Sequence, residues 1–292
     1  MQSRIQSWPR LISSFEEIPN CFQRSFNSII NGAELFPYTV YLPEYSWDER
    51  KTNEMLLCLT DKVIYIIEVN NGNTQVIAYP FEDIVLLNRG AMLLYSWIKF
   101  AGYVNGRLKT TTIEFNTVTE KLFEKLLSMI RIQYSSSEYA AGIETAGACP
   151  DLQELDLLSA IDYKFMNYAK RSVLPDERIL EYLFQPAMSK KYFRFFSKPL
   201  SKAHMYILTG KELILIEEEY QDIKRFRTKK YLVVWNYIPL NKIKNISIGE
   251  YQTDVSVKMN IKLITRECIS SIYSYTQKDI LKSLAGRINS VR

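Results

Sequence analysis

Short stretches in which apolar residues dominate or alternate with polar ones follow one another along most of the chain, and turn residues separate them. Residues 55–68 (MLLCLTDKVIYIIE) show two such stretches around a turn. Asn105-Gly106 separates residues 93–104 from residues 107–116, and both positions of this dipeptide favour the positive φ of a two-residue hairpin turn. The pattern predicts consecutive antiparallel strands and therefore a mainly β fold.

The same succession of patterns occurs twice along the chain. Residues 205–218 (MYILTGKELILIEE) repeat the pattern of residues 55–68, with Thr209 at the place of Thr60. Three further landmarks recur in the same order: residues 34–43 with 177–186, residues 80–85 (PFEDIV) with 239–244 (PLNKIK), and a helix-start signal at 117–120 (TVTE) with 276–279 (TQKD). Four landmarks in one order predict an internal repeat.

Helices are expected before and after the strands of each copy. Residues 22–30 show helical spacing ahead of the first copy. Asp151, with Glu154 three residues later, is a candidate N-cap for a helix over residues 152–170 that leads into the second copy. The two helix-start signals precede apolar residues at helical spacing. The repeat unit is therefore predicted to be helix, sheet, helix.

Each copy resembles a bacterial pleckstrin-homology-like (PH-like) domain. The resemblance rests on LCLTDKVIYIIE and YPFEDIV in the first copy and on YILTGKELILIEE and WNYIPLNKIKNIS in the second. It implies two tandem bent β-barrels, each of about seven antiparallel strands closed by a C-terminal helix, with a non-catalytic binding role. It does not imply a ligand, since one fold serves many functions.

The length of the chain fits this organisation, because 292 residues are enough for two domains of about 100–150 residues each. Residues 135–150 (SSSEYAAGIETAGACP) are rich in Ser, Ala and Gly and are predicted to be a linker. We expect residues 1–134 to hold a helical lead-in and the first PH-like domain, with a core at 33–131. Residues 151–292 are expected to hold a helix and the second domain, with a core at 176–290.

Charge is distributed unevenly between the two halves. Residues 1–150 hold 13 Lys and Arg against 16 Asp and Glu, a net charge of −3, whereas residues 151–292 hold 24 against 16, a net charge of +8. The excess lies in two segments, 189–202 (SKKYFRFFSKPLSK) and 224–230 (KRFRTKK), and the first also carries four aromatic rings. The basic residues are Lys190, Lys191, Arg194, Lys198, Lys202, Lys224, Arg225, Arg227, Lys229 and Lys230, and the aromatic residues are Tyr192, Phe193, Phe195 and Phe196.

Both basic segments are expected at one rim of the second domain. In an up-and-down meander, the connection between strands one and two and the connection between strands three and four emerge at the same end. The 189–202 segment belongs to the first of these connections and the 224–230 segment to the other. The matching connections of the first copy, residues 44–54 and 69–76, are acidic and uncharged, respectively. A rim that served only solubility would be expected in both copies.

Several interpretations of this basic rim remain open. The first is a solvated surface whose rings pack on the barrel. The second is a peripheral site for an anionic membrane surface or headgroup. The third is a site for an acidic protein surface or for self-association. The PH-like resemblance implies basic residues in this connection where a phosphorylated headgroup is bound, so we favour the membrane. The runner-up is a protein-interaction or self-assembly scaffold without a lipid ligand. Nucleic acid is a weaker alternative, because no RNP, KH or helix-turn-helix signature is present.

The sequence argues against an enzyme and against a bound cofactor or metal. His204, the only histidine, is expected to be structural, since no nucleophile motif, phosphate-binding loop or metal-site spacing accompanies it. Glu217, Glu218 and Glu219 are expected to form a solvated strand edge. The four cysteines lie far apart, which predicts buried free thiols.

The distribution of apolar residues along the chain indicates where in the cell the protein is expected. No apolar run approaches the ~20 residues of a transmembrane helix, and the N-terminal residues form no continuous apolar segment. We therefore expect a cytoplasmic protein. Its contact with a membrane would be peripheral, at the inner membrane surface.

Overall fold

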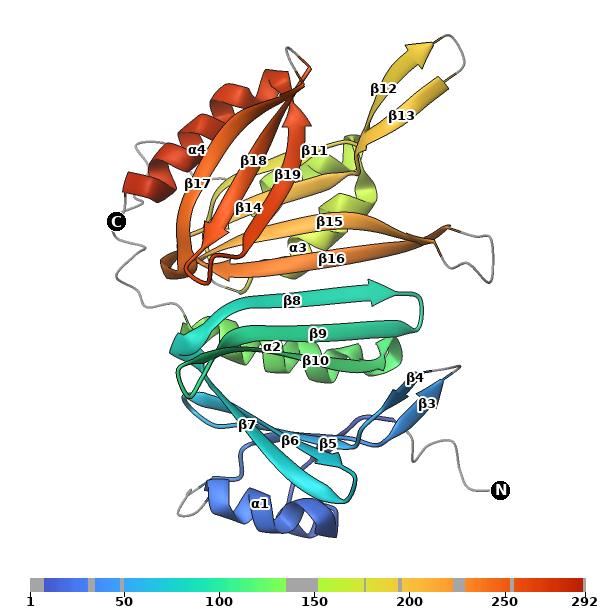
Figure 1. The fold of residues 1–292 in the computed structure, drawn as a ribbon, viewed down its shortest axis with the longest axis vertical. Coiled ribbons are helices and arrows are strands. Elements are labelled where there is room, and N and C mark those ends of the chain that lie inside the picture. The colour runs from blue at the N-terminus through green and yellow to red at the C-terminus, as the bar shows by residue number, and fades with distance from the viewer. Residues whose placement is uncertain are drawn as a thin grey trace. The chain divides into compact units, whose positions relative to one another are not determined.

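The computed structural model describes residues 8–30, 35–47, 50–134, 152–175, 177–193, 196–222, 229–252 and 255–290. They form several antiparallel sheets with a few helices, so the expected mainly β class is confirmed (Figure 1). The chain divides into two compact units. The first unit comprises the residues up to 84 together with 91–134, and the second comprises 85–90 and the residues after 134.

The first unit contains a five-stranded antiparallel sheet in the order β1-β2-β5-β6-β7, a short hairpin β3–β4 and a long hairpin β9–β10. One helix lies between β1 and β2 along the chain, and another follows β10. The elements are β1 (Arg10–Ile12), η2 (Phe15–Glu17), α1 (Asn20–Ile30), β2 (Tyr38–Leu42), β3 (Tyr45–Trp47), β4 (Arg50–Thr52), β5 (Met55–Leu59), β6 (Val63–Asn70), β7 (Asn73–Pro80), η3 (Phe81–Asp83), β9 (Tyr95–Val104), β10 (Arg107–Asn116), η4 (Thr117–Thr119) and α2 (Glu120–Tyr134), and β8 (Ile84–Met92) runs across the division of the chain.

Helical spacing of apolar residues determines how the helices of this unit pack. Phe22 and Phe26 lie on one face of α1, and both are buried against β5 and β6 in a cluster with Leu56 and Ile67. The helix predicted at residues 22–30 is therefore confirmed as α1. In α2, buried residues recur at the same spacing from Phe123 onward, so this helix also covers a core with one face.

The predicted Asn105-Gly106 hairpin is confirmed. Asn105 has φ 51° and Gly106 has φ 74°, the left-handed conformation that a two-residue turn between twisted strands needs. Strands β9 and β10 pair without interruption from Val104–Arg107 to Tyr95–Asn116. This turn sets the register of the hairpin.

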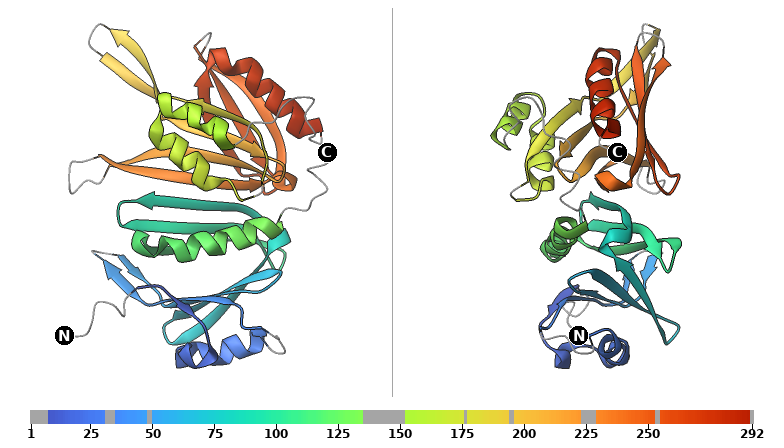
Figure 2. Two further views of the ribbon diagram at one scale, coloured as in Figure 1. Left: turned by 180° about the vertical axis from the view of Figure 1, so that it is seen from behind. Right: turned by 90° about the vertical axis from the view of Figure 1, so that its left-hand side faces the viewer.

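The second unit contains the four-stranded series β11-β14-β15-β16, the three-stranded sheet β17-β18-β19 and the hairpin β12–β13. Figure 2 shows η6 and α3 on one face of the four-stranded series and α4 against the three-stranded sheet. The elements are η6 (Leu152–Ala160), α3 (Tyr163–Ser172), β11 (Ile179–Gln185), β12 (Met188–Phe193), β13 (Phe196–Ser201), β14 (His204–Thr209), β15 (Glu212–Asp222), β16 (Lys229–Pro239), η7 (Leu240–Lys242), β17 (Ile243–Gln252), β18 (Ser256–Leu263), β19 (Cys268–Ser274), η8 (Tyr275–Gln277) and α4 (Lys278–Ser290).

The repeated threonine has the same structural role in both units. The Oγ1 of Thr60 donates to the carbonyl oxygen of Val63 at 3.0 Å, and the Oγ1 of Thr209 donates to that of Glu212 at 3.2 Å. Each bond closes the tight turn between two strands, β5 and β6 or β14 and β15. The threonine recurs because the turn needs a short side chain that can donate to its own backbone.

The repeated lysine and proline also have matching roles. The carbonyl oxygen of Lys62 accepts a hydrogen bond from the backbone N–H of Phe81 at 2.9 Å, and that of Lys211 accepts one from Leu240 at 3.0 Å. In both units this bond holds a short 3-10 helix that begins directly after a proline. These contacts account for two of the four repeated landmarks.

The strand pairings found among the described residues leave open sheets in both units. Closure into a seven-stranded barrel therefore stays a prediction. The predicted linker at 135–150 lies outside the described residues.

Two local expectations are wrong. Residues 152–160 form a 3-10 helix, and α3 begins only after Asp162, whose carboxylate accepts hydrogen bonds from the N–H groups of Lys164 and Phe165 at 3.0 and 3.1 Å. This second cap restarts the helix, whereas Asp151 lies outside the described residues. The glutamates 217–219 do not form a sheet edge, because β15 lies between β14 and β16 and Glu218 is buried in an ion pair with Lys164.

Candidate functional site

Strand register places the connections that carry the two basic segments at one end of the second unit. Gln185 of β11 pairs with His204 of β14, which pairs with Glu217 of β15, so the chain between β11 and β14 leaves and rejoins the sheet at this end. Strands β15 and β16 extend further in the same direction, as far as the pair Asp222–Lys229. We call this the hairpin end of the unit.

The hairpin β12–β13 is the main feature of this end, and Figure 1 shows it extending away from both sheets of the unit. Lys190 pairs with Lys198, and Phe193 pairs with Phe196. The register therefore places two lysines of the predicted basic rim opposite each other on the backbone of this hairpin.

The predicted site residues differ in how far the structure describes them. Lys190 is half-buried and Lys202 is exposed. For Lys191, Tyr192, Phe193, Phe196, Lys198, Lys229 and Lys230 only the backbone is described, and Arg194, Phe195, Lys224, Arg225 and Arg227 lie outside the described residues. Their participation in one site stays a prediction.

A buried polar group lies beneath the base of the hairpin. His204 is 4% exposed, its Nδ1 donates to the carbonyl oxygen of Lys202 at 2.8 Å, and its ring meets that of Tyr273 edge-on with 4.5 Å between centroids. Burial lowers the pKa of His204 to about 4, so the imidazole is neutral at pH 7 and its Nε2 is an acceptor. This Nε2, the Tyr273 hydroxyl and the Ser256 hydroxyl are buried without a hydrogen-bond partner among the described residues.

Two carboxylates belong to the same polar interior. Glu217 accepts a hydrogen bond from the Ser271 hydroxyl at 2.7 Å, and burial raises the pKa of this glutamate. Glu181 accepts from the Tyr206 hydroxyl and forms an ion pair with Arg287. Sequence reasoning missed this group, because its members come from strands far apart in the chain.

At the matching end of the first unit, two of the three equivalent positions are apolar. Leu42 pairs with Met55, and Met55 pairs with Glu68, so these three residues hold the positions of Gln185, His204 and Glu217 in the second unit. The first unit has the short hairpin β3–β4 here, together with the end of the β6–β7 hairpin, which pairs as far as Asn70–Asn73. Lys51 of the β3–β4 hairpin forms an ion pair with Glu44, with 3.1 Å between Nζ and Oε1.

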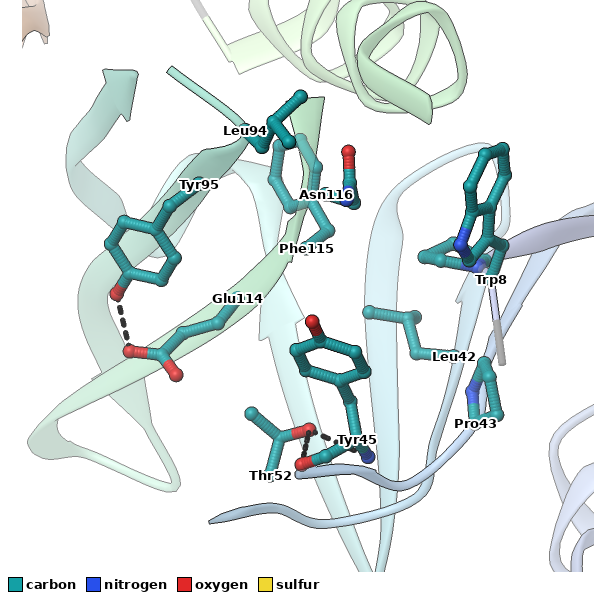
Figure 3. A pocket seen from close by; sticks show the side chains of 11 residues that line it. Trp8, Leu42, Pro43, Tyr45, Thr52, Leu94, Tyr95, Glu114, Phe115 and Asn116 are labelled. Atoms are coloured by element: carbon teal, nitrogen blue, oxygen red, sulfur yellow. Dashed lines mark hydrogen bonds between the residues drawn. The ribbon is translucent and has the colours of Figure 1, made fainter. Parts of the chain in front are cut away.

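A cavity of about 170 Å³ opens at this end of the first unit (Figure 3). Leu42 lies at its base, and the rings of Trp8, Tyr45 and Phe115 surround it. Trp8 is 44% exposed and Tyr45 is 41% exposed, so part of each ring stands at the mouth. The lining residues are Trp8, Pro9, Leu42, Pro43, Tyr45, Thr52, Leu94, Tyr95, Glu114, Phe115 and Asn116.

A second, more polar cavity of about 280 Å³ adjoins the first and shares three lining residues with it, Leu42, Thr52 and Glu114. Its other carboxylate is that of Glu68, which accepts a hydrogen bond from Asn53 Nδ2 at 2.6 Å. The hydroxyl of Tyr95 donates to Glu114. Two carboxylates therefore stand beside the apolar cavity.

Sequence reasoning also missed this cavity. Leu93 and Leu94 were expected to begin a strand, but β8 ends at Met92 and Leu93 has φ 53° in the turn that follows. Their side chains are 73% and 64% exposed. Two adjacent leucines at a turn indicate an exposed apolar surface. The sequence alone did not show that they lie at a turn, because the end of the strand before them was not known.

The structure adds detail on the remaining reactive groups. Cys58 is buried, and burial raises the pKa of its thiol to about 12. Cys21 and Cys268 are exposed, so the expectation of burial is wrong for these two, and Cys149 lies outside the described residues. Within the described ranges, no group of three His, Cys, Asp or Glu side chains is placed to bind a metal ion.

Within the same ranges, the helices are too short or too polar for any of them to span a bilayer. Comparison of the sequence with protein-family models and with curated proteins finds no match.

Proposed function

We propose that the chain is a non-enzymatic binding protein of two tandem PH-like modules, and that the hairpin end of the second unit associates with an anionic membrane surface or a phosphorylated lipid headgroup. The observation that carries this proposal is the strand register, which brings the connections bearing both basic segments to one end of one sheet. The recurrence of the same series of strands, turns and 3-10 helices in both units supports the tandem modules.

Physical chemistry favours a membrane as the partner of this end. Each Lys or Arg near an anionic bilayer contributes ~1 kcal/mol of attraction, so every basic residue of the two segments that faces the bilayer strengthens the association. Aromatic rings beside them suit the interface between headgroups and acyl chains. A hairpin that extends from the sheets reaches a flat surface without rearrangement of the core.

Co-sedimentation of the full chain with vesicles tests the proposal. We expect binding to phosphatidylcholine vesicles that contain phosphatidylserine, no binding to pure phosphatidylcholine vesicles, and weaker binding at high salt. Competition with a single-stranded oligonucleotide separates lipid from nucleic acid. Equal sedimentation with both vesicle types at low salt would contradict the membrane and leave the basic rim to an acidic protein or to self-association.

A further inference from the structure

We infer that the apolar cavity of the first unit is a docking site for a segment of another protein, one that presents a single aromatic or branched aliphatic side chain next to a Lys or Arg. The inference is independent of the membrane proposal, because it concerns the other unit and other residues. Three observations carry it: the size of the cavity, the exposed apolar residues at its mouth and the carboxylates beside it.

The size of the cavity selects one side chain. Its volume of about 170 Å³ is close to that of an engineered protein cavity of about 150 Å³ that stays dry and binds benzene. A phenyl or branched aliphatic group fits this space. A lipid acyl chain is much longer and would leave most of its carbons outside.

Exposed apolar side chains continue beyond the cavity. Leu94 and Trp8 stand at its mouth, and the carbonyl oxygen of Leu94 accepts a hydrogen bond from Thr117 N–H at 3.0 Å, which brings the 58% exposed Val118 close to them. Clustered apolar residues on a surface mark interaction sites more often than scattered ones do. Exposed tryptophan and tyrosine beside a pocket are typical of the centre of a protein interface.

Charge decides which kind of segment fits. Glu68 and Glu114 line the adjoining cavity, and the one lysine there, Lys51, lies 3.1 Å from the carboxylate of Glu44. A cationic side chain next to the apolar anchor would meet the carboxylate of Glu68, whereas an acidic one would be repelled by it. The partner segment is therefore basic as well as apolar.

The second unit has different residues at the positions that match the cavity lining and its surroundings. At the matching positions it has Gln185 and His204 in place of Leu42 and Met55, and the second-last residue of its final strand is the buried Tyr273 instead of Phe115. The apolar lining of the cavity is thus not repeated at these positions of the second unit, as expected for a ligand that only the first unit binds.

Four small probes test the site on the full chain by isothermal titration and by NMR shifts of the cavity residues. They are the blocked tetrapeptides Gly-Phe-Lys-Gly, Gly-Phe-Glu-Gly and Gly-Ala-Lys-Gly, and decanoate. We expect the Phe-Lys peptide to bind with a Kd on the order of 1 mM, as small ligands of a single pocket do, and at least about fivefold more tightly than the other two peptides.

Variants locate the binding. Leu94→Glu places a charge at the apolar mouth and should weaken Phe-Lys binding about tenfold or more, because the peptide would then bury that charge. Leu108→Glu is the matched control, since Leu108 is also exposed but lies at the far end of β10, and it should change nothing. Glu68→Lys should reverse the preference between the Phe-Lys and Phe-Glu peptides, and thermal melting of each variant checks that it folds.

Several outcomes would overturn the inference. Equal affinity for the three peptides, or none measurable, would remove the site. Tighter binding of decanoate than of the Phe-Lys peptide would assign the cavity to a lipid. Self-association of the unmutated chain that Leu94→Glu abolishes would assign it to a second copy. None of these outcomes bears on vesicle binding, so the membrane proposal is tested separately.

Discussion

At the end of the first unit, Leu42 lines an apolar cavity and Met55 lines the more polar cavity beside it, whereas Gln185 and His204 hold the same positions in the second unit and belong to a buried polar group. At the opposite end of both sheets, the turn that contains Thr60 or Thr209 and the 3-10 helix that follows a proline are built alike. Shared turn chemistry maintains the common fold at one end. The other end has different side chains in the two units, and both proposed binding sites lie there.

The largest expected effect is on membrane binding and uses the two hairpins as each other's control. Reversing Lys190, Lys191 and Arg194 to Glu should weaken binding to anionic vesicles by roughly 3 to 6 kcal/mol, since each charge near the surface contributes ~1 kcal/mol. The matched reversal of Arg50 and Lys51 in the first unit should have no effect. Co-sedimentation measures both variants, and equal losses would show that the hairpins do not differ in function.

The buried histidine predicts a pH dependence that the first unit lacks. Its pKa is about 4 in the folded state and 6.5 in the unfolded state, so the unfolded chain takes up the proton first as the pH falls. The effect of His204 on the free energy of unfolding is therefore absent above pH 6.5. As the pH falls from 6.5 towards 4, the free energy of unfolding decreases by up to about 3 kcal/mol. Burial raises the pKa of Glu217, so this residue makes the folded state more stable as the pH falls. A variant without the histidine is therefore needed to separate the contribution of His204.

His204→Gln is that variant. Urea unfolding at pH 7 and at pH 4.5 measures the free energy of unfolding at both pH values. We expect the decrease between them to be much smaller for the variant than for the unmutated chain. Binding to anionic vesicles should stay within about tenfold, because the His204 side chain is buried and is not part of the surface that would meet the bilayer. A larger loss of binding with the fold intact would point to a direct role of the imidazole.

Transfer of the polar residue to the first unit tests the same contrast from the other side. Met55→His should reduce the free energy of unfolding by about 2 kcal/mol at pH 7, because the apolar burial of the Met55 side chain is lost and a polar imidazole is desolvated in its place. Urea unfolding measures the loss. An unchanged stability would show that the two ends are less different than their side chains indicate.

Local signals in the sequence were sufficient for the repeat, the Asn105-Gly106 hairpin and helix α1, because turn chemistry and helical spacing depend on neighbouring residues. The sequence could not distinguish Asp151 from Asp162 as the cap, since each precedes a helical pattern. The candidate sites were harder still to predict. Trp8 and Phe115 meet at one cavity only after strand pairing, and nothing near His204 in the sequence points to Tyr273.

The smallest expected effect separates the rings of the second hairpin from its charges. Replacing Phe195 and Phe196 with Ser should lower the affinity for anionic vesicles about tenfold and leave the melting temperature unchanged, because rings that enter the membrane interface contribute to binding and not to the core. Trp47→Ser, in the short hairpin of the first unit, is the control and should not affect vesicle binding. If the rings instead pack on the domain as a satellite cluster, the double variant would melt several degrees lower with binding retained, since buried aromatic area would be lost. That result would leave the membrane contact to the basic residues alone and would make the two hairpins differ only in charge.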